Sequence, residues 1–386
     1  MQELPSSGII GVQWTHRVLT CRSAFTSSGD DLAALFPDAP SRVLVVLDDG
    51  LATAAPDLLA AITQWSSTHT DRVQAAGSPL IVPGGEQAKN DRTVFDQVVR
   101  AIHERHICRQ SFVLAVGGGA MLDAVGLAAA TAHRGVRMIR LPSTTLSQAD
   151  AGVGVKNGIN AFGAKNLIGT FAPPWAVVND ATLLPTLSDR DWRAGLSEAV
   201  KVALLKDESL LHDVEHAGVA LQNRDLVVME RIVTRTADLH VSHIVAGGDP
   251  FEVDRARPLD FGHWSAHQLE QMTGFRLSHG DAVAIGLMID LQYAALKHVA
   301  ASSLVQRVAN CLQSLGFPLW CDAMGDQDRL LEGIERFREH LGGALAITMV
   351  AAPERPVEVS SIDVDVMRQA IELTMRRGTD YISRTG

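Results

Sequence analysis

Three histidines lie within 17 positions of the chain, in the segment PLDFGHWSAHQLEQMTGFRLSHGD at 258–281. His263 and His267 are four residues apart, a spacing that places both rings on one face of a helix. The zinc-protease pattern H-E-x-x-H has this spacing, but Trp264 stands where that pattern has its general-base glutamate. We therefore expect no hydrolytic zinc site. A metal site, an acid–base device and polar histidines on the wet side of a helix all remain open.

Glu198 and Lys201 form a second pair of reactive side chains, in the segment GLSEAVK. At spacing i,i+3 they share a helical face, so a structural ion pair explains them as well as a functional role does. Alternatively, Glu198 could be the carboxylate that joins two histidines around a divalent metal with open positions for substrate.

Two glycine-rich segments have the composition of phosphate-binding sites. Gly117, Gly118 and Gly119 separate an apolar stretch from a helical one, so bare backbone and a helix N-terminus would meet a pyrophosphate there. They do not form G-x-G-x-x-G, and a tight structural turn explains them about as well. The segment ADAGVGVKNGINAFGAKNLIG carries two lysines and an amide, donors that suit a phosphate, although a surface loop is the alternative.

Composition excludes several kinds of partner. The net charge of −10 disfavours nucleic acid and anionic membrane surfaces. No apolar run approaches the roughly 20 residues of a membrane span, and the first residues lack the features of a signal peptide. Four cysteines form no CxxC pair and predict no disulfide framework, so we expect a cytoplasmic protein. Only six residues are lysines, so each is a good candidate for a point charge that arginine cannot replace.

Alternating strand and helix patterns fill the first 185 residues and must position these side chains. The patterns predict strands at 41–48, 78–86, 111–119 and 136–145, and helices at 57–65, 93–105 and 120–135. This alternation is typical of a parallel sheet covered by helices. Beyond it, apolar residues recur at helical spacing, with one late strand near residue 350. We predict two domains, 1–185 and 186–386, with ligands at the carboxyl ends of the strands and in the domain cleft.

In their order, the motifs resemble those of the sugar phosphate cyclases, the family that includes 3-dehydroquinate synthase. The resemblance runs from about Asp48 to residue 350 and rests on GGE..K, GGGAMLDAVG, HRGVR, PSTTLSQAD, GVGVK, GAKNLIG, LSEAVK, DFGH and LSHGDAVAIG. It implies an N-terminal NAD-binding α/β domain with a parallel sheet and a mostly α-helical C-terminal domain. It also implies a small sugar phosphate as substrate and a homodimer.

The resemblance assigns a role to each matching position. The metal, zinc or cobalt, falls to Glu198, His263 and His279, and His267 becomes a substrate or phosphate contact. Asp150 would lie between substrate and nicotinamide. The remaining substrate and phosphate contacts would be Arg134, Lys156, Asn166 and Lys201. Residues of the N-terminal half would hold NAD: Asp48, Glu86, Lys89, Gly117, Gly118, Gly119, Asp123, Thr144, Lys165 and Thr182. Four of the six lysines fall on these positions.

The chemistry implied is a sequence of steps on one bound substrate. NAD oxidises a secondary alcohol whose pKa the metal lowers, phosphate leaves by β-elimination, the ketone is reduced again, and an aldol step closes the carbocycle. A metal-dependent NAD alcohol or glycerol dehydrogenase is the nearest alternative, but such an enzyme needs no phosphate cradle. A catalytically inactive NAD-binding sensor would not need the full set of ligands and lysines.

Some positions depart from the dehydroquinate synthases, which use basic and amide side chains to hold a substrate carboxylate. The departures are Ser242, Ala256, Asp260 and His340, where lysine, arginine, asparagine and lysine are expected. Asp260 beside a substrate carboxylate would set like charges together, whereas it suits a hydroxyl donor. We therefore predict sedoheptulose 7-phosphate as substrate and a valiolone-type cyclitol as product. The alternative is 3-dehydroquinate synthase, with Arg255 or Arg257 reaching the carboxylate.

Overall fold

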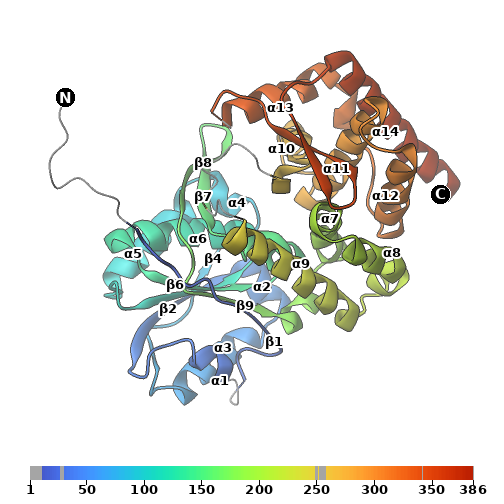
Figure 1. Cartoon of the computed structure of the whole chain (residues 1–386). Helices are drawn as coiled ribbons and strands as arrows, with labels where there is room; N and C mark the ends of the chain where they lie inside the picture. Colours follow the sequence, from blue (N-terminus) through green and yellow to red (C-terminus); the bar gives the residue numbers. More distant parts are fainter. Residues whose placement is uncertain (1–10, 27–29, 248–250, 252–257, 341, 386) are drawn as a thin grey trace, which may run out of the picture.

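The computed structural model describes residues 11–26, 30–247, 251, 258–340 and 342–385. An α/β half and a helical half lie side by side, joined through the long helix α7 (Asp189–Lys206) (Figure 1). This is the predicted fold class, and it is confirmed.

The α/β half is built on a seven-stranded sheet in the order β1-β9-β6-β5-β2-β3, with β4 also paired to β2. Every pair in it is parallel. The strands are β1 (Val18–Cys21), β2 (Ser41–Asp48), β3 (Val73–Ala75), β4 (Leu80–Val82), β5 (Phe112–Gly117), β6 (Arg137–Pro142) and β9 (Ala176–Asp180). The parallel sheet agrees with the prediction from sequence.

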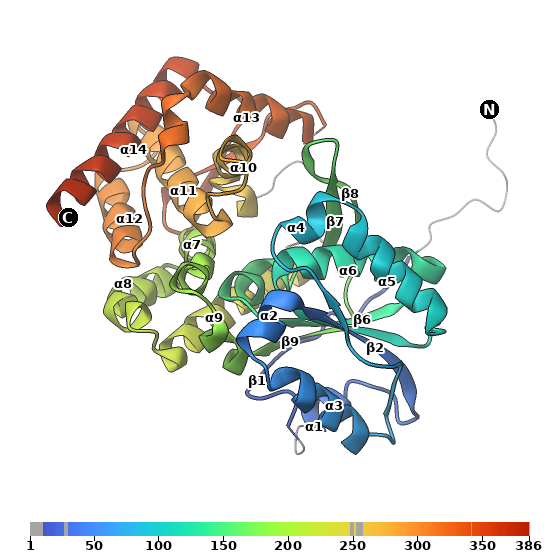
Figure 2. The same ribbon diagram turned by 180° about the vertical axis from the view of Figure 1, so that it is seen from behind.

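Helices cover both faces of this sheet, which explains the continuous apolar runs of its central strands. In β2, Leu44 and Val46 pack with α4 (Gln87–Asn90), α5 (Thr93–Glu104) and α6 (Gly119–Thr131). The alternate residues of β2 pack on the other face with α1 (Asp30–Ala33), α2 (Asp49–Ala54) and α3 (Leu58–Thr68). The two layers lie above and below the sheet in Figure 2.

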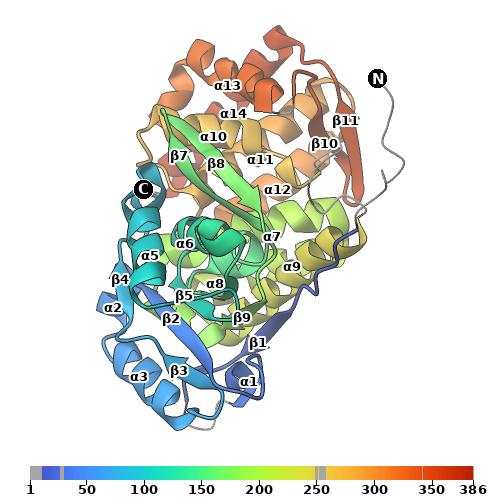
Figure 3. The same ribbon diagram turned by 90° about the vertical axis from the view of Figure 1, so that its left-hand side faces the viewer.

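The glycine-rich segment after β6 forms regular structure where the sequence shows no strand pattern. A π-helical turn, η2 (Ser147–Ala151), leads into an antiparallel hairpin of β7 (Lys156–Ala161) and β8 (Ala164–Phe171). A Cβ on Gly169 would lie 2.6 Å from the carbonyl oxygen of Asn157, so glycine is required where the two strands pair at this point. Glycine is a poor strand former, and it conceals the hairpin in the sequence. The hairpin extends toward α10 (His263–Met272) (Figure 3).

The helical half is organised around α11 (His279–Leu296), which is buried on all sides from Gly280 to Leu291. Around it lie α7, α10, α8 (Glu208–Gln222), α9 (Leu226–Ala246), α12 (Ser302–Ser314), α13 (Gln327–His340), α14 (Val364–Thr385) and the antiparallel pair β10 (Ile347–Ala352) and β11 (Arg355–Val359). Across the described residues, helices long and apolar enough to cross a membrane are absent.

Candidate active site

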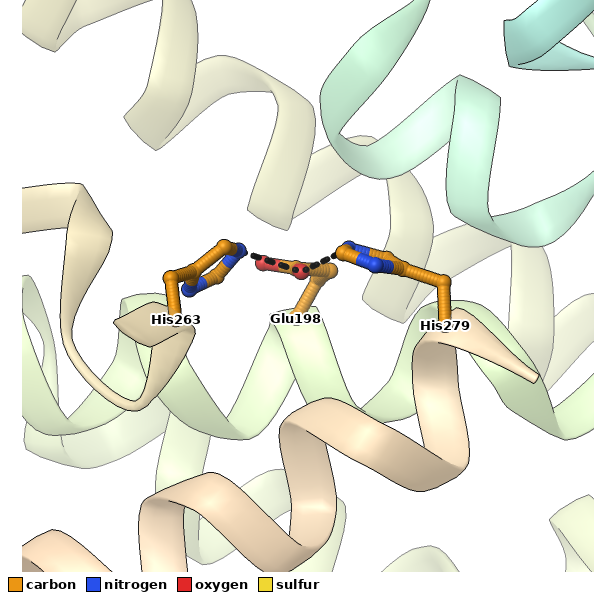
Figure 4. Close-up of side chains that lie close together, drawn as sticks. All are labelled: Glu198, His263 and His279. Atoms are coloured by element: carbon orange, nitrogen blue, oxygen red, sulfur yellow. Dashed lines mark ion pairs between the residues drawn. The ribbon is translucent and has the colours of Figure 1, made fainter. Parts of the chain in front are cut away.

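Glu198, His263 and His279 bring one ligand atom each to a common point between three helices (Figure 4). Glu198 comes from the middle of α7, and the two histidines are the first residues of α10 and α11. Glu198 Oε1 lies 3.5 Å from His263 Nε2 and 3.4 Å from His279 Nε2. The three donor atoms lie within 4.8 Å of one another, so one small cation could contact all of them.

Local structure holds His263 in place. Gly262 precedes α10 with φ of 77°, a left-handed conformation that glycine adopts without steric cost. Its N–H donates to Asp290 Oδ2 at 2.9 Å, and the indole N–H of Trp264 donates to Asp290 Oδ1 at 2.7 Å. His263 Nδ1 lies 3.1 Å from the carbonyl oxygen of Phe261. With Nδ1 donating to that carbonyl, Nε2 faces the common point with a free lone pair.

The donor set fits a divalent transition metal. Glu198 is fully buried, and within the described part of the chain neither of its oxygens makes a hydrogen bond of good geometry. Lys201 Nζ lies 2.5 Å from Glu198 Oε2 and partly balances its charge. A buried carboxylate beside two imidazole nitrogens is the arrangement that zinc accepts in catalytic sites. The structure brings together the three residues that the family resemblance assigns to the metal, and their role as ligands stays a prediction.

The charges and the burial of the cluster shift the pKa values of Glu198 and His279 in opposite directions. Burial would raise the pKa of Glu198, but Lys201 and His263 hold it well below its ordinary value. Burial would lower the pKa of His279, but Glu270 and Glu198 raise it to about 9. His279 is therefore protonated on both ring nitrogens at neutral pH in the metal-free protein. A bound metal would displace the proton on Nε2.

His267 lies beside this cluster in a different environment. Its ring centroid is 5.4 Å from that of His263 and 6.0 Å from that of His279. Burial and the neighbouring His263 hold its pKa well below the ordinary value, so its ring is neutral at pH 7. A neutral imidazole can donate one hydrogen bond and accept another.

Lys201 is the buried positive charge of the site. Burial would lower its pKa, but Glu198, Asp150 and Asp260 raise it above the ordinary value. Burial would raise the pKa of Asp150, but Lys201 brings it down to about 2. The tertiary structure thus brings Asp150 of η2 and Asp260 of η4 (Pro258–Asp260) close to Lys201 of α7, which lies against Glu198.

The residues assigned to NAD lie mostly at the carboxyl ends of the strands. Asp48 ends β2 and caps α2, and Gly118 N–H lies 3.4 Å from its Oδ2. A Cβ on Gly117 would lie 2.7 Å from Asp48 Cβ, which explains the glycine there. Two of these residues contact each other, Lys89 and Asp123 at 2.6 Å. Others contact neighbouring side chains: Glu86 with Asn160 at 2.8 Å, Thr144 with Ser147 at 2.8 Å and Thr182 with Asp180 at 2.6 Å.

The predicted site residues of the hairpin point to different surroundings. Lys156 and Asn166 are exposed, whereas Lys165 turns inward and its Nζ lies 2.8 Å from Glu270 Oε1. Arg134 is exposed at the end of η1 (Ala132–Arg134), beyond the 13 residues of α6, which span about 20 Å from the glycines. Within one chain, therefore, Arg134 does not join the cluster, and its assignment stays a prediction.

Of the positions that depart from the family pattern, only some lie within the described residues. Ser242 lies on α9 and Asp260 in η4. His340 ends α13, and its side chain lies outside the described residues. Arg255, Ala256 and Arg257 also lie outside them, so a rescue of a carboxylate by either arginine stays untested.

Three further side chains contact the site and were missed from the sequence. Glu270 lies 3.3 Å from His279 Nδ1, and His240 Nδ1 lies 2.8 Å from Asp150 Oδ1. The guanidinium of Arg140 is fully buried and donates to the carbonyls of Gly152, Gly154 and Lys156. Glu270 had a visible signal, because it follows His263 by seven residues and His267 by three on one helical face. Arg140 and His240 meet the site only through tertiary contacts.

Comparisons with known proteins identify the family. Residues 79–194 match the family described as 3-dehydroquinate synthase N-terminal, and residues 195–340 match 3-dehydroquinate synthase C-terminal. The chain is 35% identical over 283 residues to a 3-dehydroquinate synthase of Bartonella tribocorum, covering 72% of this chain and 71% of that protein.

Two solved structures share the fold. A 2-epi-5-epi-valiolone synthase from Streptomyces hygroscopicus subsp. jinggangensis, with NAD+ and Zn2+ bound, superposes with a TM-score of 0.87 at 25% identity, covering 97% of this chain and all of that one. A 2-deoxy-scyllo-inosose synthase superposes with a TM-score of 0.73 at 21% identity, covering 92% of this chain and 95% of that one.

Proposed function

Because the chain belongs to the 3-dehydroquinate synthase family of sugar phosphate cyclases, we propose that it converts a seven-carbon sugar phosphate into a carbocycle and releases inorganic phosphate. The observation that carries this proposal is the fully buried Glu198 between two histidine nitrogens, with the Lys201 ammonium against its other oxygen. In this arrangement a metal site and a positive charge for a leaving phosphate lie next to each other.

We propose that Glu198, His263 and His279 hold zinc or cobalt, and that NAD lies along the carboxyl ends of β2 and β5. The NAD+ and Zn2+ bound to the Streptomyces synthase support this assignment. When bound, such a metal lowers the pKa of a substrate hydroxyl, and NAD supplies reversible hydride transfer.

The side chains of the protein would perform the remaining work. Lys201 keeps its positive charge in a buried setting, so it can stabilise negative charge that develops on the substrate. His267, neutral at pH 7, can hydrogen-bond to the substrate or its phosphate. Lys156 and Asn166 on the hairpin are proposed as further phosphate donors, and Asp150 as a contact of the reacting carbon's hydroxyl.

Two substrates compete within this proposal. The named relatives favour 3-dehydroquinate synthase activity, because those with 30–35% identity carry that name. The site chemistry supports sedoheptulose 7-phosphate as a second candidate, because Asp260 places a negative charge near Lys201. A carboxylate at this point would repel the carboxylate of 3-deoxy-arabino-heptulosonate 7-phosphate and accept a hydrogen bond from a hydroxyl of sedoheptulose 7-phosphate.

One experiment tests both the cyclase activity and the choice of substrate. The protein is incubated with NAD, zinc or cobalt, and each sugar phosphate, while inorganic phosphate and NADH are measured. Phosphate release without net NADH is expected with one of the two substrates. Turnover of only 3-deoxy-arabino-heptulosonate 7-phosphate would establish the 3-dehydroquinate synthase alternative. Net NADH without phosphate release would overturn the cyclase proposal in favour of a dehydrogenase.

Two expectations about the whole molecule also remain proposals. We propose a division into domains near residue 185, where the short η3 (Ala181–Thr186) separates the sheet from α7. We also propose a homodimer in the cytoplasm, and light scattering coupled to size-exclusion chromatography would measure the mass in solution.

A further inference from the structure

Two polar contacts join three residues, from the helical half to the hairpin of the α/β half. His279 Nδ1 lies 3.3 Å from Glu270 Oε2, and Lys165 Nζ lies 2.8 Å from Glu270 Oε1. Glu270 is 4% exposed and stands on α10, His279 begins α11, and Lys165 belongs to β8. Two successive helices and a strand about 100 residues earlier in the chain thus meet directly behind one proposed metal ligand.

The contact with Glu270 determines which ring nitrogen of His279 has the free lone pair. A carboxylate can only accept hydrogen bonds, so His279 Nδ1 must carry a proton to bond to Glu270. In the metal-bound tautomer, the lone pair then lies on Nε2, the atom that faces Glu198. A carboxylate behind a ligating imidazole also raises its basicity and orients its ring.

We propose that Glu270 is a positioning residue for the proposed metal ligand His279, and that Lys165 holds Glu270 in place. This inference rests on the proposed metal site. His267, Glu270 and His279 also form a possible ligand group by distance. Both oxygens of Glu270 already have partners, however, so the contacts favour a supporting role over direct ligation.

Lys165 makes metal binding depend on the α/β half. Its side chain is largely buried, lies 5.5 Å from the ring centroid of Phe275 and has a second carboxylate, Glu86, at 3.8 Å. Without this ammonium, Glu270 would be a buried carboxylate facing only an imidazole, a costly arrangement. The site should therefore weaken when a residue that does not touch the metal is changed on the hairpin.

The first test measures zinc affinity in the metal-free protein, without substrate or NAD, by competition with a chromogenic chelator. Glu270→Ala should bind zinc about 10–100-fold more weakly than wild type. Lys165→Met should change affinity in the same direction by a smaller factor. Glu215→Gln is the matched control, because Glu215 is a part-buried carboxylate held by Arg307 elsewhere. The visible spectrum of the cobalt form should change in Glu270→Ala and not in the control.

A double-mutant cycle separates positioning from mere structural support. In Glu270→Gln, one acceptor oxygen is contested by Lys165 and His279. Adding Lys165→Met frees that oxygen for His279, so the double variant should regain affinity relative to Glu270→Gln. Wild-type affinity in Glu270→Ala, or additive losses in the cycle, would overturn the inference. Failure of the wild-type protein to bind zinc would instead overturn the proposed metal site.

Discussion

The imidazoles of His263, His267 and His279 differ in their surroundings, although they lie close together in the sequence. His263 and His279 direct Nε2 at Glu198, and each has an oxygen acceptor behind Nδ1. His267 has no such contact with Glu198 among the described residues, and its ring is neutral at pH 7. The same residue type can therefore serve as ligand or as hydrogen-bonding group, depending on orientation and burial.

Because of this difference, replacing each of these histidines should have a different effect on bound zinc and on activity. His263→Ala and His279→Ala should each lose bound zinc and activity together, because each removes one of three ligands. His267→Ala should keep its zinc and lose turnover. Metal content after dialysis, measured by plasma mass spectrometry, checks the prediction. Full zinc occupancy in His263→Ala would contradict the ligand assignment.

Lys201→Met should affect stability as well as rate. It leaves Glu198 as a buried charge without its ammonium partner, which costs about 3–5 kcal/mol of unfolding free energy in the metal-free protein. Zinc should restore much of this loss, because the metal supplies a new positive charge. The rate of phosphate release should fall at least about tenfold, as a lost charge-assisted hydrogen bond is worth about 1.5–3 kcal/mol.

Lys156→Met provides the comparison for Lys201→Met. Lys156 is exposed at the start of β7, so its replacement should change unfolding free energy by less than about 0.5 kcal/mol. Phosphate release should nevertheless fall about tenfold if Lys156 contacts the phosphate. Urea denaturation and phosphate assays measure the two effects separately. Near-native turnover would place the phosphate site elsewhere.

At the scale of elements, the site depends on where helices begin. His263 and His279 are first residues of α10 and α11, and Glu198 is held in the middle of the buried helix α7. Asp290, on α11, accepts hydrogen bonds from Gly262 and Trp264 and so fixes the start of α10. Helix α11 thereby provides the proposed ligand His279 at its N-terminus, and its Asp290 positions the proposed ligand His263.

Asp290 makes stability depend on pH. Burial raises its pKa to about 7, against about 4 in an unfolded chain. The folded protein therefore retains a proton that the unfolded chain releases, so this residue lowers stability as pH rises from about 4 to about 7. Because an amide has one acceptor oxygen for these two donors, Asp290→Asn should be less stable than wild type at pH 5. This difference in unfolding free energy should shrink as pH rises toward 8, measured by urea denaturation of metal-free protein. A difference that is constant with pH, as expected for the exposed Asp322→Asn, would refute this.

At the scale of the whole molecule, the site exists because the two halves pack closely. α7 approaches the turn after β6 so tightly that a Cβ on Gly195 would lie 2.4 Å from the carbonyl carbon of Thr145. Gly195 N–H also donates to Thr145 Oγ1 at 3.1 Å. This contact brings Glu198 and Lys201 of α7 near Asp150 of η2, and the Lys165–Glu270 ion pair joins the halves at the hairpin.

Gly195→Ala should separate α7 from the turn after β6. The added methyl group would displace α7 or the turn, costing about 1–3 kcal/mol of unfolding free energy. Phosphate release should fall further than stability alone explains, because Lys201 and Asp150 move apart. Gly325→Ala is the matched control, because a Cβ there meets nothing within 4 Å. Equal stability and activity in the two variants would show that this packing is not required.

Local patterns were sufficient for the central strands and the longer helices of the α/β half, but they did not predict β1, β3 and β9. Central strands such as β2 and β5 are buried on both faces and read as apolar runs, and their helices have clear amphipathic spacing. The hairpin β7–β8 was not predicted as strands, because Gly158 and Gly169 are needed where its backbones approach. Backbone proximity leaves no periodic signal in side-chain hydrophobicity.

The sequence by itself determined the fold class and the family, and it supplied the group of residues proposed as metal ligands, because these follow from local spacing and motif order. Only the tertiary structure decided that Nε2 of His263 and His279 converge on Glu198, that Lys165 turns to Glu270, and that Arg134 lies apart. These outcomes depend on how helices distant in the chain cross and which atoms they bury. Such contacts arise from packing between elements, which no spacing within one element encodes.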